Sequence, residues 1–258
     1  MKFGTCYKMP RVLTEELPVA DYLELSAADI SLLSPEDYRR LLSLVREGRF
    51  TPYSANALLR PDLRLTGPEV DMNAIRDYLD TLLYQLAELG ISLLVFGSGK
   101  AKRVPDGFPM EAAWEQLYAL GDLLADKAAT YGQTVVVEPL SYTEVNIVNT
   151  LDEGADYCRK VGKKNFKLLV DFFHFDNNKE PWDSIGRNVD LLAHTHFAAP
   201  NLRTMPASEE EWDFVRKCLK SLKDCGYDGT ISYEGRGTPP ASDYSDMILR
   251  LKREYAAL

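Results

Sequence analysis

Residues 135–146 read VVVEPLSYTEVN, and this stretch decides the fold class of the chain. Three consecutive valines predict a buried β-strand, because β-branched side chains pack well on a pleated sheet. A carboxylate, Glu138, follows the strand at once, and a second carboxylate, Glu144, lies six residues further on. The end of a buried strand lies where the core meets the surface. The role of a charged side chain at this place therefore depends on which other residues the fold places beside it.

The pattern of a short apolar run followed by an amphipathic segment repeats along the chain. Between most of the runs lie segments of helical period, and one of them, residues 71–89, places six apolar side chains on one stripe (Ile75, Leu79, Leu82, Leu83, Leu86, Leu89). Strands that alternate with helices predict a parallel sheet. The runs predict eight strands, at about 2–7, 21–25, 49–53, 91–96, 134–138, 166–171, 191–196 and 229–234.

Helix-boundary signals support the alternation. Residues 66–69, 150–153 and 208–211 each place Ser or Thr three residues before Glu, which is the capping-box spacing of a helix start. Pro35 in SPED fits the first turn of a helix. Five glycines follow helical segments and precede strands, as expected of residues with positive φ just past a helix end (Gly48, Gly90, Gly132, Gly162, Gly226).

Eight strand–helix units in 258 residues match an α/β fold of the (β/α)8 TIM-barrel type, and we expect one TIM-barrel domain over residues 1–258. The rival, a doubly wound open sheet, usually carries a glycine-rich phosphate loop after an early strand. The segment most similar to such a loop is FGSGK at 96–100, which has neither the GxGxxG spacing nor the GxxxxGK(S/T) spacing of phosphate-binding loops. Lys100, Lys102 and Arg103 in the loop that follows would make an anion grip, but a solvated basic loop is the preferred interpretation.

Charge and composition restrict the partners. The formal net charge is −9, which argues against binding to nucleic-acid phosphates. No apolar run approaches the length of a membrane span, and the first residues lack the apolar stretch of a signal peptide. The four cysteines show no CxxC spacing, so we expect reduced thiols rather than a disulfide framework. These features predict a soluble cytoplasmic protein with neither a membrane nor a nucleic-acid partner.

The last four predicted strands all end in a residue that can bind a metal: Glu138, Asp171, His196 and Glu234. In a barrel the carboxyl ends of the strands ring one mouth, so these side chains are expected to converge. Three carboxylates at one point repel one another, and a divalent cation removes the conflict. The mostly oxygen ligand set favours Mn²⁺, with Mg²⁺, Co²⁺ or Zn²⁺ as alternatives. A single carboxylate at a strand end is more often a cap or a salt-bridge partner; the prediction depends on all four together.

Three motifs then resemble a known family: VVVEPLSYTEVNIVNT at 135–150, LLVDFFHF at 168–175, and HTH at 194–196 followed by YEGRG at 233–237. Together they resemble the sugar phosphate isomerase/epimerase superfamily, whose barrel is xylose-isomerase-like and whose members include ketose 3-epimerases, hydroxypyruvate isomerase and inosose dehydratase. The resemblance is clearest over residues 91–235. It implies that Glu138, Asp171, His196 and Glu234 hold the metal.

The resemblance also implies the catalytic roles. Glu138 and Glu234 would face the substrate from opposite sides, one removing a proton to form an enediolate and the other returning a proton. Glu144, His174 and Arg203 would bind substrate. His194 is expected on the opposite strand face from the metal histidine, with a structural role.

The predicted function is therefore a metal-dependent isomerase or epimerase of an unphosphorylated keto sugar or polyol ketone. Ser141, Tyr142 and residues 197–199 depart from the ketose 3-epimerase pattern and leave the substrate open. A lyase using the same enolisation, of the inosose dehydratase or 3-keto-C-glycoside-cleaving kind, is one alternative, and a non-catalytic sugar- or metal-binding subunit is another. An abasic-DNA nuclease is disfavoured because it would need a trinuclear zinc cluster with more than the three histidines present, and a basic face. The expected partner is a small carbohydrate, and a homo-oligomer remains open.

Overall fold

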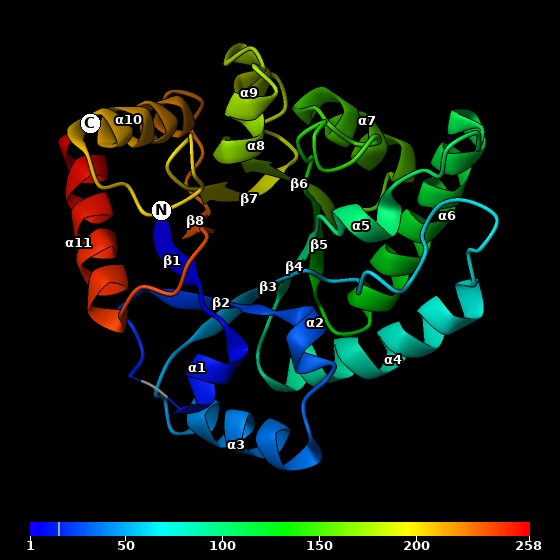
Figure 1. The fold of residues 1–258 in the computed structure, drawn as a ribbon, viewed down its shortest axis with the longest axis horizontal. Helices are drawn as coiled ribbons and strands as arrows, with labels where there is room; N and C mark the ends of the chain where they lie inside the picture. The colour runs from blue at the N-terminus through cyan, green and yellow to red at the C-terminus, as the bar shows by residue number, and fades with distance from the viewer. Residues whose placement is uncertain (15) are drawn as a thin grey trace.

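Eight parallel strands close into a barrel in the computed structural model, which describes residues 1–14 and 16–258 (Figure 1). Each strand pairs with the next, and β1 pairs with β8 to close the barrel. The (β/α)8 prediction is confirmed. The strands are β1 Lys2–Cys6, β2 Tyr22–Ser26, β3 Pro52–Asn56, β4 Leu93–Phe96, β5 Thr134–Val137, β6 Phe166–Asp171, β7 Leu192–Phe197 and β8 Thr230–Tyr233.

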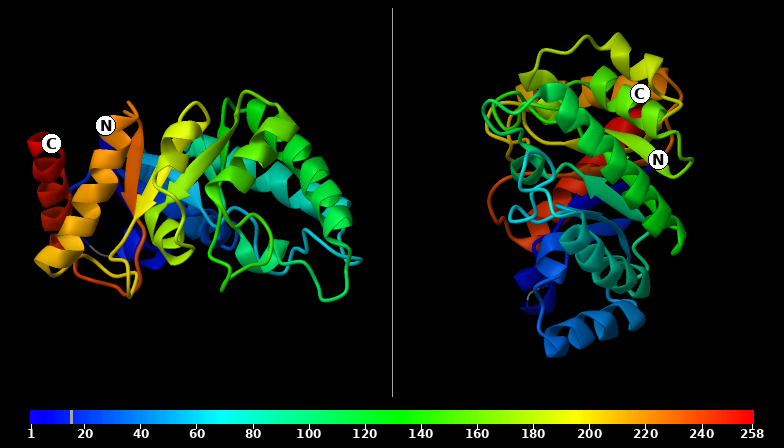
Figure 2. Two further views of the ribbon diagram at one scale, coloured as in Figure 1. Left: turned by 90° about the horizontal axis from the view of Figure 1, so that it is seen from above. Right: turned by 90° about the vertical axis from the view of Figure 1, so that its right-hand side faces the viewer.

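Helices surround the barrel on its outside (Figure 2). The long helix α4 buries the predicted apolar stripe against the sheet. No helix of the described residues is long and apolar enough to cross a membrane. The helices are α1 Met9–Thr14, α2 Ala27–Ile30, α3 Pro35–Arg46, α4 Met72–Glu88, α5 Gly99–Lys102, α6 Met110–Ala129, α7 Leu151–Val161, α8 Phe172–Asn177, α9 Asp183–Arg187, α10 Glu209–Asp224 and α11 Ala241–Ala257.

Most of the predicted helix boundaries are confirmed. Ser34 caps α3 with Pro35 in its first turn, Thr150 caps α7, and Ser208 forms a complete capping box with Glu211 on α10. The five predicted glycine stops all have φ between +66° and +78°. Glycine adopts these angles without the steric cost that a Cβ atom imposes.

Two boundary predictions are wrong. The TGPE segment starts no helix: the Thr66 hydroxyl donates to the carbonyls of Lys102 and Arg103, while Asp71 caps α4. The third strand runs over 52–56 rather than 49–53, because the Arg49 amide still bonds back to the end of α3. This shift moves Asn56 to the carboxyl end of β3.

The valine run shows how the strands are buried. Val135 and Val137 pack in the large core between sheet and helices. Val136 belongs to a separate cluster with Leu93, Val95 and Leu169, as alternation along a strand requires. Glu138 lies two residues after Val136, so its side chain is on the same face of the sheet as Val136 and points towards the mouth of the barrel.

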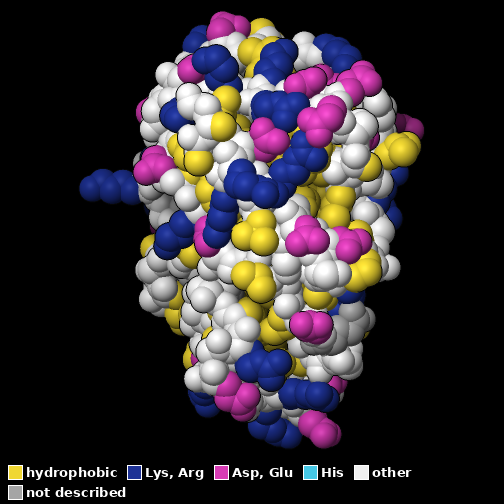
Figure 3. All heavy atoms as spheres, turned by 90° about the vertical axis from the view of Figure 1, so that its left-hand side faces the viewer, with side chains coloured by type: hydrophobic (Ala, Val, Ile, Leu, Met, Phe, Trp, Pro, Cys, Tyr) yellow, Lys and Arg dark blue, Asp and Glu magenta, His cyan; other side chains and the backbone are white. Residues whose placement is uncertain are grey.

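The outer face over α10 and α11 carries charges of both signs (Figure 3). Arg216 and Arg250 each form ion pairs with Glu209 and Glu254. Because positive and negative side chains are interspersed on this face, it forms no broad basic surface for binding a polyanion.

Candidate active site

The four predicted metal ligands meet at the carboxyl ends of the last four strands. Asp171 ends β6, His196 lies near the end of β7, and Glu138 and Glu234 directly follow β5 and β8. Each side chain offers a ligand atom, and these atoms all lie within 4.8 Å of one another. The convergence expected of a barrel mouth is therefore present in this chain.

Two atoms of this cluster are buried without a hydrogen bond. His196 Nδ1 lies 3.4 Å from Glu138 Oε1 and 3.2 Å from Glu234 Oε2. Neither His196 Nδ1 nor Glu138 Oε1 has a hydrogen-bond partner among the described residues. A buried polar atom left unpaired costs free energy, and coordination of one cation would satisfy both. Three carboxylates and an imidazole are also a donor set that suits a divalent ion.

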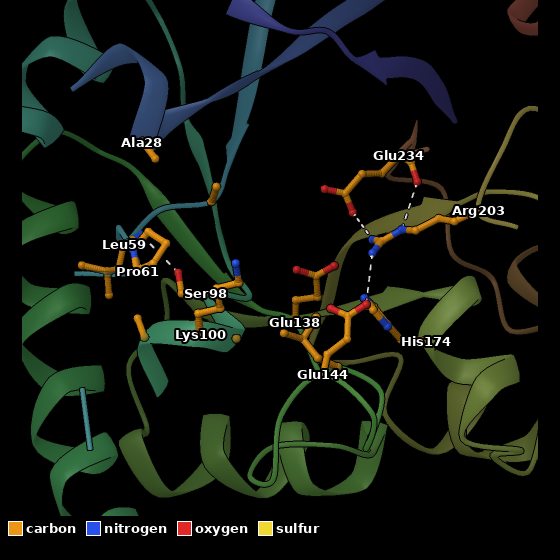
Figure 4. A pocket seen from close by; sticks show the side chains of 14 residues that line it. Ala28, Leu59, Pro61, Ser98, Lys100, Glu138, Glu144, His174, Arg203 and Glu234 are labelled. Carbon is orange, nitrogen blue, oxygen red and sulfur yellow. Dashed lines mark hydrogen bonds and ion pairs between the residues drawn. The ribbon is translucent and has the colours of Figure 1, made fainter. Parts of the chain in front are cut away.

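Arg203 is the cation closest to these carboxylates. Its Nη2 donates to Asp171 Oδ2 at 2.7 Å and to Glu234 Oε2 at 2.5 Å. Figure 4 shows the contact with Glu234. Its backbone has φ +56°, a left-handed conformation in which the Arg203 amide donates to the Ala199 carbonyl. The loop after β7 thus turns the guanidinium towards the four-residue cluster.

The charges push the pKa values of the two glutamates apart. Burial, and then the negative charge of Glu234, raises the pKa of Glu138 above its usual range. Burial alone would raise the pKa of Glu234 too, but the charges of Arg203 and His196 outweigh it and lower that pKa well below its usual range. Burial would lower the pKa of His196, but Glu24 and Glu234 raise it. A bound cation would add its own charge to this balance.

The three predicted substrate-binding residues line a cavity of about 230 Å³ together with Glu138 and Glu234. His174 Nδ1 accepts from the Ser141 amide at 3.2 Å, so a neutral ring carries its proton on Nε2. That Nε2 has no hydrogen-bond partner among the described residues. The structure therefore brings Glu144, His174 and Arg203 to one space beside the cluster (Figure 4).

A sequence comparison identifies the family. The pattern of the xylose isomerase-like TIM barrel family matches residues 16–254. The chain belongs to this family.

Named relatives of this family member act on sugars. The 3-dehydro-D-guloside 4-epimerase of Escherichia coli strain K12 is 31% identical over 133 residues, which is 50% of this chain and 50% of the relative; the match thus spans half the length of that protein. The D-psicose 3-epimerase of Ruminiclostridium cellulolyticum is 25% identical over 228 residues, covering 83% of this chain and 73% of the relative. Among solved structures, the apo 3-keto-D-glucoside 4-epimerase of E. coli superposes with a TM-score of 0.75 at 18% identity, covering 98% of this chain and 99% of that one.

Two functional candidates in this xylose isomerase-like barrel escaped the sequence analysis. Asn56 donates from Nδ2 to Glu234 Oε1 at 2.7 Å, and Glu24 contacts the His196 ring. A second cavity, of about 500 Å³, adjoins both residues and shares Glu234 with the first. Glu24 could have been noticed as a charge within the apolar run YLEL, whereas Asn56 lay beyond the misplaced third strand.

The segment that contains Lys100, Lys102 and Arg103 differs from the solvated basic loop that the sequence predicts. Lys102 is 1% exposed and donates from Nζ to the Glu138 carbonyl at 3.1 Å. Burial lowers the pKa of Lys102 to about 8. Arg103 donates to the Glu144 carbonyl, and Lys100 lines the first cavity. The short helix α5 folds Lys102 beneath the site, so a solvated loop is wrong for this residue.

The expected face of His194 is also wrong. Side chains two residues apart on a strand point to the same side, so His194 and His196 share one face. Their rings lie 4.9 Å apart, and both contact Glu24. His194 is not a member of the four-residue metal cluster.

Proposed function

We propose that this protein is a divalent-metal-dependent isomerase or epimerase of an unphosphorylated keto sugar or related ketone. The observation that carries the proposal is the meeting of Glu138, Asp171, His196 and Glu234 within 4.8 Å, with two of their buried polar atoms unpaired. The printed activities of the relatives, epimerisations of D-psicose and of a 3-dehydro-D-guloside, agree with a keto sugar.

The same four residues would hold the ion. A divalent ion in this position would polarise a substrate carbonyl and so acidify the neighbouring C–H bond. Glu138 and Glu234 come from β5 and β8, across the mouth from each other, and both line the first cavity. One carboxylate accepts the proton from carbon, and the other delivers a proton. Delivery to the opposite face of the same carbon inverts that centre. Delivery to the neighbouring carbon isomerises the sugar, provided that the hydroxyl proton on that carbon's oxygen moves to the former carbonyl oxygen.

Three residues would orient the substrate. His174 Nε2 can donate to a carbonyl or hydroxyl oxygen, Arg203 can donate to an oxygen that gains negative charge, and the Glu144 carboxylate can accept from a hydroxyl. Three carboxylates, those of Glu138, Glu144 and Glu234, line the cavity of about 230 Å³ beside two cations, Lys100 and Arg203. Arg203 already pairs with Asp171 and Glu234, so the lining favours a neutral polyhydroxy ketone over a phosphate ester.

The decisive test is proton exchange with solvent. The Mn²⁺-loaded protein is incubated in D₂O with free ketohexoses and with 3-keto-glycosides, and products are followed by NMR. The proposal expects deuterium at the carbon next to the carbonyl, with neither loss of water nor release of an aglycone. Loss of water or aglycone would instead identify a lyase, and no exchange into any member of the panel would favour a binding protein.

Variants attribute the exchange to the site. Glu138→Gln and Glu234→Gln keep the side-chain size but remove the proton-accepting carboxylates, so each should lower exchange at least about 100-fold. Glu88→Gln, at the end of α4 on the outside of the barrel, is the matched control and should exchange normally. A Glu138→Gln, Glu234→Gln double variant with full activity would refute the proposal.

A further inference from the structure

Glu24 is a carboxylate inside the barrel that no catalytic step described above uses. It lies in the middle of β2 and is 0% exposed. Its Oε1 accepts from His196 Nε2 at 2.9 Å. Its Oε2 accepts from His194 Nε2 at 2.8 Å and from two hydroxyls, those of Ser54 at 2.8 Å and Ser232 at 2.7 Å. A buried charge is tolerated when hydrogen bonds of this kind surround it.

This set of donors determines which nitrogen of His196 is protonated. An ionised carboxylate only accepts hydrogen bonds, so His196 Nε2 must carry a proton to bond Glu24. In the neutral ring the lone pair is then on Nδ1. Nδ1 is the atom that lies 3.4 Å from Glu138 Oε1 and 3.2 Å from Glu234 Oε2.

We propose that Glu24 is a positioning residue that holds the His196 ring in the Nε2–H tautomer, with Nδ1 directed at the metal position. The inference rests on the metal site of the proposed function. Carboxylates that accept from the outer nitrogen of a metal-binding histidine fix its orientation and raise its basicity. Glu24 on β2 thereby orients His196, a candidate metal ligand on β7, from across the inside of the barrel.

One other arrangement uses the same residues. Cys6, Glu24 and His196 also have ligand atoms within 4.8 Å of one another. Ligation through Nε2 would replace the 2.9 Å hydrogen bond to Glu24 and put the ring proton on Nδ1. Nδ1 lies 3.4 Å from Glu138 Oε1 and 3.2 Å from Glu234 Oε2 and makes no hydrogen bond to either. The positioning role keeps both ring nitrogens satisfied, so the geometry favours it.

The first test measures metal affinity rather than turnover. Free Mn²⁺ is titrated into the metal-free protein and followed by electron paramagnetic resonance. Glu24→Gln should weaken Mn²⁺ binding about 10–100-fold, because an amide can also present N–H to His196 and so release the ring. His194→Leu is the matched control: it removes a donor of similar distance and burial from the same carboxylate but leaves the bond to His196. Its Mn²⁺ affinity should stay within about threefold of the wild-type value.

The second test needs no variant and therefore no assumption that Glu24→Gln folds. The wild-type protein is labelled with ¹⁵N-histidine and loaded with diamagnetic Mg²⁺. His196 should show a protonated Nε2 with a hydrogen-bonded proton and an Nδ1 shifted by the ion. A protonated Nδ1, or Mn²⁺ affinity in Glu24→Gln within about threefold of wild type, would overturn the inference. Absence of Mn²⁺ binding to the wild-type protein would instead overturn the proposed function itself.

Discussion

Gly97 leaves room for the Glu138 carboxylate, and this offers the sharpest test of the site. A Cβ atom added at Gly97 would lie 2.1 Å from Glu138 Oε2 and 3.2 Å from its Cδ. Ordinary contacts begin at 3.4 Å, so in Gly97→Ala the oxygen must retreat by about 1.3 Å. A displacement of about 1 Å in a reacting group lowers rates roughly 100-fold, or about 2.7 kcal/mol in transition-state free energy.

The same change should hardly affect folding. The obstructing atom is the end of a flexible side chain, and Gly97 is not among the residues with positive φ. Alanine also restricts the unfolded chain, which stabilises by about 0.4–1 kcal/mol where the native backbone permits it. We therefore expect kcat/KM for the proposed reaction to fall about 100-fold while Tm moves by only a few degrees.

The assay compares Gly97→Ala with Gly186→Ala by steady-state kinetics and calorimetry. Gly186 is the matched control, since the nearest heavy atom to an added Cβ there is 3.9 Å away and its φ is ordinary. Wild-type kcat/KM in Gly97→Ala would show that Glu138 need not occupy its observed position. A fall in Tm large enough to explain the loss of activity would equally refute the reasoning.

Three further outcomes follow from the same contacts. Asn56→Ala removes the donor to Glu234 Oε1, so kcat should fall about 10-fold with KM little changed, as steady-state kinetics will show. Lys102 has a folded pKa of about 8, below its usual 10.5, so the unfolded state binds more protons between these values and stability rises with pH through that window. Denaturant titration should show wild type gaining about 2 kcal/mol over Lys102→Met from pH 7 to pH 9.5, and a constant difference would contradict this. Mn²⁺ at 100 times its Kd should stabilise the chelator-treated protein by about 2.7 kcal/mol, raising Tm in calorimetry; an unchanged Tm would contradict a site formed in the folded state alone.

The sequence alone determined the features that depend on local chemistry. The valine run, the amphipathic stripe of α4 and the five glycine stops each reflect the preferences of a few consecutive residues, and all are found in the structure. The topology of a parallel barrel then brings strand ends to one mouth, which is why the sequence suffices to place Glu138, Asp171, His196 and Glu234 together.

Only the tertiary structure decided which residues from distant parts of the chain contact the four site residues. Glu24 meets His196 across 172 positions of sequence, Asn56 meets Glu234 across 178, and Lys102 is buried because α5 folds beneath Glu138. Strand periodicity gives the face on which a side chain lies but not its partner on a distant strand. The loop that turns Arg203 towards Asp171 depends on both local and distant contacts: the Arg203 amide donates to the Ala199 carbonyl of the same loop, and the Arg203 carbonyl accepts from the distant Arg236 amide. The chain's local preferences therefore specify the barrel and its four candidate metal ligands, while close packing of distant segments specifies the hydrogen bonds and charges that surround the site.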